Sequence, residues 1–182
     1  MGTAYYDAKR ADSYGSARGL TRQTGIKIVG DFLANQDAYT LLRNVWRRVK
    51  RPKTYVLGIN HLWQIDLIDL SSLTRYNDGY RYVLTCIDVF SKYGRISLLR
   101  TKMGTAVRDA VEKMILDTRP VYFQSNKGTE FLNASFQKLL KDGNIKHYTS
   151  ENEDIKCAVV EWWNRTLMTR MHRYFMHRNT LP

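Results

Sequence analysis

The chain has 182 residues, and 43% of them are hydrophobic, which is enough to bury one good core with a small appendage. Its 29 Lys and Arg residues against 17 Asp and Glu give a net charge of +12, so we expect a polyanionic partner, with nucleic acid as the leading candidate. No apolar run approaches the roughly 18–20 residues of a membrane span, and the first residues lack the hydrophobic region of a signal peptide. These features argue against a membrane protein and predict an intracellular one.

Residues 1–53 are predicted to form a small helical module that ends in a basic linker. Apolar residues at helical spacing indicate short amphipathic helices, with interruptions at Gly25 and Asn35. A run of basic residues without an intervening acid follows, and Pro52 stops any helix there. This run is either a solvated linker or an arm that contacts phosphates, and it contains Arg43, Arg47, Arg48, Lys50, Arg51 and Lys53.

Residues 54–182 are predicted to form an α/β domain. Short apolar runs predict strands over residues 62–70, 82–90, 95–99, 121–124 and 145–148, with a hairpin-type connection at residues 76–79. Helical spacing of apolar residues predicts helices over residues 104–117, 132–140 and 160–174. The order βββαβαβα describes a mixed five-stranded sheet flanked by helices.

Three polar positions at the ends of these elements have the pattern of a two-metal site. Asp66 lies in the first strand, Asn126 lies just past the fourth strand, and Glu161 lies at the start of the last helix. Two Mg²⁺ or Mn²⁺ ions roughly 3.5–4 Å apart need carboxylate oxygens from separate elements. Asn126 offers a carbonyl oxygen but no charge, so we expect metal binding at this site to be weakened.

Other candidate ligands have structural interpretations. Asp69 is expected on the opposite face of its strand from Asp66, Asp88 is expected to make structural hydrogen bonds, and Glu130 suits a helix start. We expect no zinc, because Cys86 and Cys157 are not spaced as a CxxC pair and the histidines do not complete a zinc pattern.

Five motifs, in this order, resemble the catalytic core of retroviral-type integrases, which has the ribonuclease-H-like fold. Residues 61–178 carry the resemblance, and they are most similar to integrases of Maverick (Polinton) DNA transposons. Residues 5–53 resemble the helical segment that precedes this core in the same elements. The motifs are Trp63-Gln-Ile-Asp-Leu-Ile-Asp, Tyr76-Asn-Asp-Gly-Tyr-Arg-Tyr, Ile87-Asp-Val-Phe-Ser-Lys-Tyr, Gln124-Ser-Asn-Lys-Gly-Thr-Glu-Phe and Val159-Val-Glu-Trp-Trp-Asn-Arg-Thr-Leu.

The resemblance implies an enzyme that cuts and joins DNA strands with an Asp-Asp-Glu triad. By this match, Asp66 would bridge two metal ions, position 126 would complete the first ion's site, and Glu161 would complete the second. The partners implied are double-stranded DNA, both element ends and target, and further copies of the chain, in the nucleus. Because Asn126 replaces a carboxylate, we expect strand transfer to be very weak or absent.

The resemblance also favours the phosphate-contacting interpretation of the basic run, and it adds Lys127, Asn164 and Arg165 as candidate DNA contacts. Asn164 and Arg165 share a helix face with Glu161. Related integrases usually have basic residues where this chain has Trp162 and Met168, so we expect a weaker hold on phosphate. Trp163, on another helix face, is expected in the core.

Two alternatives to an active integrase stay open. One is a non-catalytic DNA-binding or assembly protein, decayed or domesticated, that keeps the fold for its basic surface. The other is a ribonuclease H proper, which needs the same metals but matches the motif order and the helical preface less well. A deliberate Asp-to-Asn replacement would give the same residue at position 126.

Overall fold

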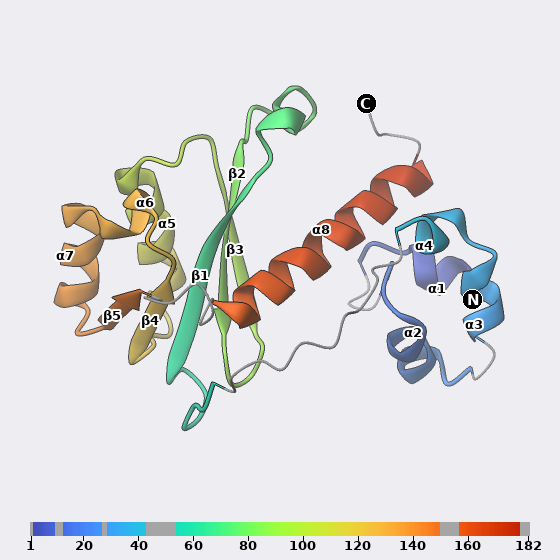
Figure 1. Cartoon of the computed structure of the whole chain (residues 1–182), viewed down its shortest axis with the longest axis horizontal. Coiled ribbons are helices and arrows are strands. Elements are labelled where there is room, and N and C mark those ends of the chain that lie inside the picture. Colours follow the sequence, from blue (N-terminus) through green and yellow to red (C-terminus); the bar gives the residue numbers. More distant parts are fainter. Residues whose placement is uncertain (1, 10–12, 27–28, 43–53, 150–156, 179–182) are drawn as a thin grey trace. The chain divides into compact units, whose positions relative to one another are not determined.

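In a computed structural model of the chain (Figure 1), the described residues are 2–9, 13–26, 29–42, 54–149 and 157–178. They form two compact units, one from Arg51–Asn164 and the other from Met1–Lys50 with Arg165–Pro182. The basic run from Arg43 to Lys53, which reaches the expected domain boundary, lies outside the described residues.

The larger unit is built on a mixed five-stranded sheet in the order β3-β2-β1-β4-β5. Strands β1, β2 and β3 pair antiparallel, whereas β4 runs parallel to β1 and β5 runs parallel to β4. This confirms the predicted mixed sheet and the order of its strands along the chain. The strands are β1 (Leu62–Asp69), β2 (Tyr82–Asp88), β3 (Gly94–Leu99), β4 (Tyr122–Ser125) and β5 (Lys146–Thr149).

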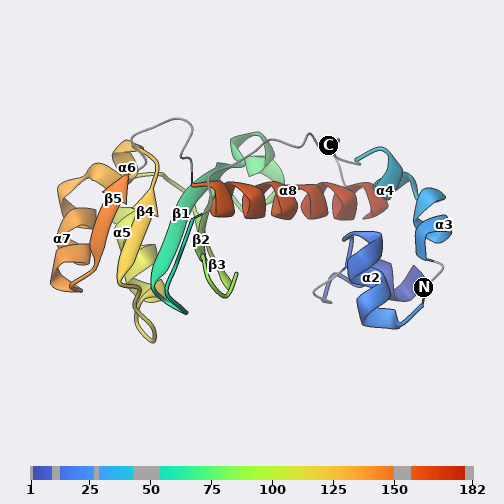
Figure 2. The same cartoon turned by 60° about the horizontal axis from the view of Figure 1, so that its bottom comes forward.

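Helices pack against both faces of this sheet, and the side chains of β1 point alternately to the two faces. Trp63 and Ile65 join the core formed with three helices, whereas Gln64 and Asp66 point to the opposite face because side chains alternate along a strand. The start of a fourth helix lies on that opposite face (Figures 1 and 2). The four helices are α5 (Gly104–Met114), α6 (Thr129–Leu132), α7 (Ala134–Asp142) and α8 (Ala158–Arg178).

The structure differs from the sequence prediction in two segments. Between β1 and β2, the 3₁₀ helix η1 (Ser71–Tyr76) precedes the turn, in which Asp78 and Gly79 have φ angles of 57° and 81°. The helix expected over residues 132–140 is divided into α6 and α7. The reason is Asn133, whose side chain accepts the N–H of Phe136 at 2.9 Å and caps a new helix.

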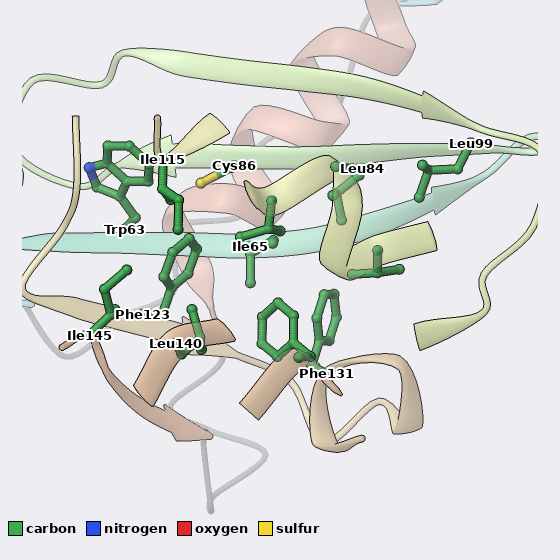
Figure 3. Packing of buried hydrophobic residues seen from close by; sticks show 14 residues of the cluster. Trp63, Ile65, Leu84, Cys86, Leu99, Ile115, Phe123, Phe131, Leu140 and Ile145 are labelled. Carbon is green, nitrogen blue, oxygen red and sulfur yellow. The ribbon is translucent and has the colours of Figure 1, made fainter. Parts of the chain in front are cut away.

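The main core lies between the sheet and helices α5–α7 (Figure 3). Trp63 of β1 and Phe123 of β4 are fully buried, and their rings meet edge to face with centroids 5.8 Å apart. Phe131 is also fully buried, and burial of a phenylalanine side chain contributes about 3 kcal/mol. This packing holds β1 and β4 side by side, so the residues that follow Trp63 and Phe123 also lie close together.

The smaller unit packs short helices around a second core that includes Tyr5 and Leu20. Gly25 ends the second of these helices with a φ angle of 71°, as the sequence predicted. Arg173 of α8 is buried and donates hydrogen bonds to the carbonyl oxygens of Tyr14 and Gly15, at 2.7 and 3.3 Å. The helices are α1 (Gly2–Tyr6), α2 (Ala17–Thr24), α3 (Val29–Ala34) and α4 (Asp37–Thr40).

Among the described helices of both units, none has the length and apolar character needed to cross a membrane.

Candidate active site

Strand β1 places the Asp66 carboxylate on the sheet face opposite the main core. Its Oδ1 atom accepts a hydrogen bond from Nδ2 of Asn126 at 3.1 Å, and its Oδ2 atom accepts one from Nδ2 of Asn164 at 2.9 Å. Asn126 directly follows β4, and Asn164 belongs to α8. One carboxylate therefore joins three elements of the fold.

Asn126 lies at the same level as Asp66 because β1 and β4 pair in parallel. Gln64 is opposite Gln124 in that pairing, and each site residue follows two positions later. The Oδ1 atom of Asn126 accepts the N–H of Gly128 at 2.9 Å. The side-chain amide is therefore fixed with its NH₂ group toward Asp66 and its oxygen toward the loop that follows β4.

Glu161 lies in the first turn of α8 and is half-buried. The start of this helix is held by Gln64, whose Oε1 atom accepts the N–H groups of Val159 and Val160 at 2.9 and 3.0 Å. Glu161 is close enough to Asp66 for its charge to affect that carboxyl group. The structure thus brings the three positions of the predicted triad to one side of the sheet.

Burial and the neighbouring charges disfavour the ionised form of Asp66. Burial raises the pKa of the Asp66 carboxyl group above its ordinary value, and the negative charges of Glu161 and Glu130 raise it further, against the effect of its hydrogen bonds. Burial together with Asp66 and Glu161 also raises the pKa of the Cys157 thiol to about 12. Cys157 is therefore not a nucleophile at neutral pH, and the excess negative charge suits a bound cation.

The donor set fits one divalent cation and does not fit two. The carboxylates of Asp66 and Glu161 are the hard oxygen ligands that Mg²⁺ and Mn²⁺ take. Asn164, which bonds Asp66 through Nδ2, also has a buried Oδ1 atom without a hydrogen-bond partner. A second ion between Asp66 and Asn126 would face the NH₂ hydrogens of the amide. Within the described part of the chain, no group of three or more His, Cys, Asp and Glu residues is placed to hold a metal.

Two of the other acids have the structural roles that the sequence suggested. Asp88 is 1% exposed and accepts the backbone N–H groups of Phe90 and Ser91 at 3.2 and 3.3 Å, which fixes the turn after β2. Asp69 accepts the N–H of Ser71 at 2.8 Å at the start of η1. Asp88 pairs with Trp63, and Asp69 follows Asp66 by three positions, so both carboxylates lie on the sheet face opposite Asp66.

The candidate DNA contacts differ in their surroundings. Lys127 and Arg165 are exposed, whereas Asn164 is only 9% exposed and uses its amide nitrogen on Asp66. Contact of these residues with DNA stays a prediction. Trp162 is exposed and Trp163 packs in the core, as their places on the helix predicted.

The buried polar residues that support the site were not identified from the sequence patterns. Gln64 lies two positions before Asp66, so both side chains point to the same face of the strand. This spacing was a signal that could have identified Gln64. Ser125 donates a hydrogen bond from Oγ to the carbonyl oxygen of Asn126 at 2.8 Å, and Nε2 of His147 lies 2.9 Å from the same Oγ. His147 comes from β5, and only the pairing of β4 with β5 reveals that it lies near Ser125.

Comparison with known proteins decides the family. The model of the integrase core domain matches residues 58–154, which are 97 positions (154 − 58 + 1) and more than half of the 182 residues. The chain belongs to the integrase core domain family. A transposon-derived protein of Caenorhabditis elegans is 32% identical to this integrase-family chain over 111 residues, which are 60% of the chain and 38% of that protein. The chain therefore spans well under half of the length of that relative.

Solved structures establish the fold. The catalytic core domain of the HTLV-2 integrase, in a structure with magnesium, is 24% identical with a TM-score of 0.56, covering 70% of this chain and 80% of that one. A chain of the simian T-cell lymphotropic virus intasome, solved with a PP2A regulatory subunit, is 19% identical with a TM-score of 0.60, covering 92% of this chain and 60% of that one. The predicted ribonuclease-H-like fold is thereby confirmed.

Proposed function

We propose that this chain is an integrase of a Maverick (Polinton) type of transposable element, and that its DNA-joining activity is impaired at Asn126. The five sequence motifs support the Maverick assignment, and the similarity to a transposon-derived protein supports an origin in a mobile element. The ancestral reaction is 3′-end processing of double-stranded DNA followed by strand transfer into a target.

One observation carries the impairment, namely the hydrogen bond from Nδ2 of Asn126 to Oδ1 of Asp66. An amide nitrogen occupies the side of Asp66 where a second carboxylate would share a cation. Loss of a ligand carboxylate removes a negative charge that faces two divalent ions, and each loss of about 1.4 kcal/mol slows a reaction about tenfold. A loss of several kcal/mol would bring strand transfer below detection in ordinary assays.

The proposed roles of the other residues follow from their contacts. Asp66 and Glu161 would hold Mg²⁺ or Mn²⁺, which when bound acts as a Lewis acid on the phosphate and stabilises the entering and leaving oxygens. Asn164 keeps the Asp66 carboxylate in place through its hydrogen bond to Oδ2. A water, and then a DNA 3′-hydroxyl, would attack phosphorus in line, so no covalent intermediate with the protein is needed.

The test is a nicking assay on blunt and pre-nicked DNA in Mn²⁺, with the wild-type chain and Asn126→Asp. We expect no detectable nicking by the wild type and measurable nicking by Asn126→Asp. The matched control adds Asp66→Asn to Asn126→Asp and should abolish that activity. If Asn126→Asp binds two metal ions without nicking either DNA, the proposal of a single lesion fails.

A second candidate is a non-catalytic DNA-binding or assembly protein. The net charge of +12 favours it, as does an Asp66 carboxylate whose two oxygens both have partners without a metal ion. Under either function we propose nuclear location, double-stranded DNA as partner and assembly of several copies. This candidate would be favoured if even Asn126→Asp binds DNA but neither transfers strands nor cleaves RNA–DNA hybrids. Cleavage of such hybrids would instead favour a ribonuclease H.

A further inference from the structure

A glutamine buried beside the site joins the two strands and the helix that carry its residues. Gln64 is 1% exposed, and its side chain makes three hydrogen bonds. Its Oε1 atom accepts the N–H groups of Val159 and Val160, and its Nε2 atom donates to Oε1 of Gln124 at 2.8 Å. The side chain therefore connects β1 with both β4 and α8.

These hydrogen bonds satisfy groups that the helix itself leaves open. The first four N–H groups of an α-helix have no partner within the helix, and a buried N–H without a partner destabilises the fold. Val159 and Val160 are the second and third residues of α8, and Gln64 accepts from both. Gln64 thus caps α8 from a neighbouring strand.

The capped turn is the one that carries Glu161. Val160 is the residue before Glu161, and Gln64 lies two positions before Asp66 on the same strand face. A side chain that fixes the start of α8 against β1 consequently also fixes the separation of the two carboxylates. Gln124, two positions before Asn126, extends the same connection to the end of β4.

We propose that Gln64 is the positioning residue of this site, which sets the place of Glu161 relative to Asp66. The part of the inference that concerns metal rests on the proposed function. The cap itself does not, because it is made entirely of protein groups. If Gln64 only fills space in the core, its replacement and that of Gln124 should have the same consequences.

The first readout is amide hydrogen exchange at individual residues by NMR. Gln64→Met keeps the length of the side chain and removes the acceptor, so we expect faster exchange at Val159 and Val160 than in the wild type. Gln64→Glu retains an acceptor, and a negative charge at a helix N-terminus is favourable, so protection should be retained. Gln124→Met is the comparison variant, because it removes the hydrogen bond that Nε2 of Gln64 donates and leaves the Oε1 acceptor that caps α8.

The second readout is the affinity for Mn²⁺ by calorimetry, with Asn126→Asp present in every protein. We expect Gln64→Met to weaken Mn²⁺ binding about tenfold, as is typical when a residue that orients a ligand is removed, and Gln124→Met to have a much smaller effect. Should Gln64→Met fail to fold, Gln64→Asn takes its place, because its shorter side chain withdraws the carbonyl oxygen from α8.

The outcomes separate the two proposals. Unchanged exchange at Val159 and Val160 in Gln64→Met, or an equal loss of affinity in Gln124→Met, would overturn the positioning role. Absence of any Mn²⁺ binding by Asn126→Asp alone would instead overturn the proposed function. In that case the exchange rates still decide whether Gln64 holds the start of α8.

Discussion

The Nδ2 atom of Asn126 lies 3.1 Å from Oδ1 of Asp66 and donates a hydrogen bond to it. An aspartate at position 126 would place a second carboxylate against the first, and the pair would then need a cation for stability. The amide of Asn126, by contrast, pairs with the Asp66 carboxylate without a metal ion.

This relationship predicts that Asn126→Asp destabilises the metal-free protein. The substitution removes a hydrogen bond to a charged group and adds repulsion, so we expect a loss of about 2 kcal/mol in the free energy of unfolding. Urea denaturation in the presence of a chelator measures it. Asn126→Ser, which adds no charge, should lose less, and equal losses in the two variants would show that repulsion plays no part.

The close approach of β3 to α8 gives a second prediction. A Cβ atom added to Gly94 would collide with the indole ring of Trp163, whereas one added to Gly58 would meet nothing within 4 Å. We expect Gly94→Ala to destabilise the protein by about 1–3 kcal/mol and Gly58→Ala to change stability little. Combining Gly94→Ala with Trp163→Leu should recover part of the lost stability. If a double-mutant cycle measured by thermal unfolding gives strictly additive losses of stability, the contact between Gly94 and Trp163 is contradicted.

A third prediction concerns pH. Burial lowers the pKa of His147 below its ordinary value of 6.5, because the charged ring loses its contact with water. Nδ1 of the ring accepts from Gln137 at 2.8 Å, and Nε2 lies 2.9 Å from Oγ of Ser125. The folded state then binds fewer protons than the unfolded state. The neutral His147 ring therefore makes its full contribution to the free energy of unfolding above pH 6.5, and this contribution is lost as the pH falls through the folded-state pKa.

Replacing His147 with Asn should therefore flatten the fall in the free energy of unfolding between about pH 7 and about pH 5. Urea denaturation at a series of pH values measures the slope. His172→Asn provides the control, since His172 belongs to the smaller unit and Ser125 to the larger one. An unchanged slope in His147→Asn would show that His147 does not stay neutral in the folded protein.

The basic run leads to a fourth prediction, that DNA binding is sequence-independent and falls steeply with salt. Neutralising Arg47, Arg48 and Arg51 together should reduce the slope of log K against log salt by about 2.7, since each phosphate contact contributes about 0.9. The matched control neutralises three exposed lysines on α5 and α7, the helices that cover the sheet face opposite Asp66; these are Lys113, Lys138 and Lys141. This control should leave the slope nearly unchanged. Equal slopes for all three proteins would remove the basic run from the interface.

The sequence predicted the sheet and the site positions for physical reasons that act locally. The short apolar run from Leu62 to Leu70 indicates a buried strand, and the turn at residues 78–79 marks its hairpin connection. Asn133 was also readable in principle, because an asparagine followed by a helical pattern is a common cap.

The support of the site could not be predicted in the same way, because it depends on contacts between distant elements. Gln64 meets Val159 and Val160 across 95 and 96 positions of sequence, and Asn164 meets Asp66 across 98. Spacing along one helix placed Asn164 on the face of Glu161, and we predicted a DNA contact for it. Only the packing of α8 on the sheet shows that its amide nitrogen is used on Asp66.

The most direct measurement of the central claim is a calorimetric titration of Mn²⁺ into the wild-type chain and into Asn126→Asp, with Asp66→Asn as the control that should bind least. Because Asp66 and Glu161 remain while the amide of Asn126 faces Asp66, we expect one weak site in the wild type and two sites in Asn126→Asp. Two equally tight Mn²⁺ sites in the wild-type chain would contradict the proposal that Asn126 disables this integrase core.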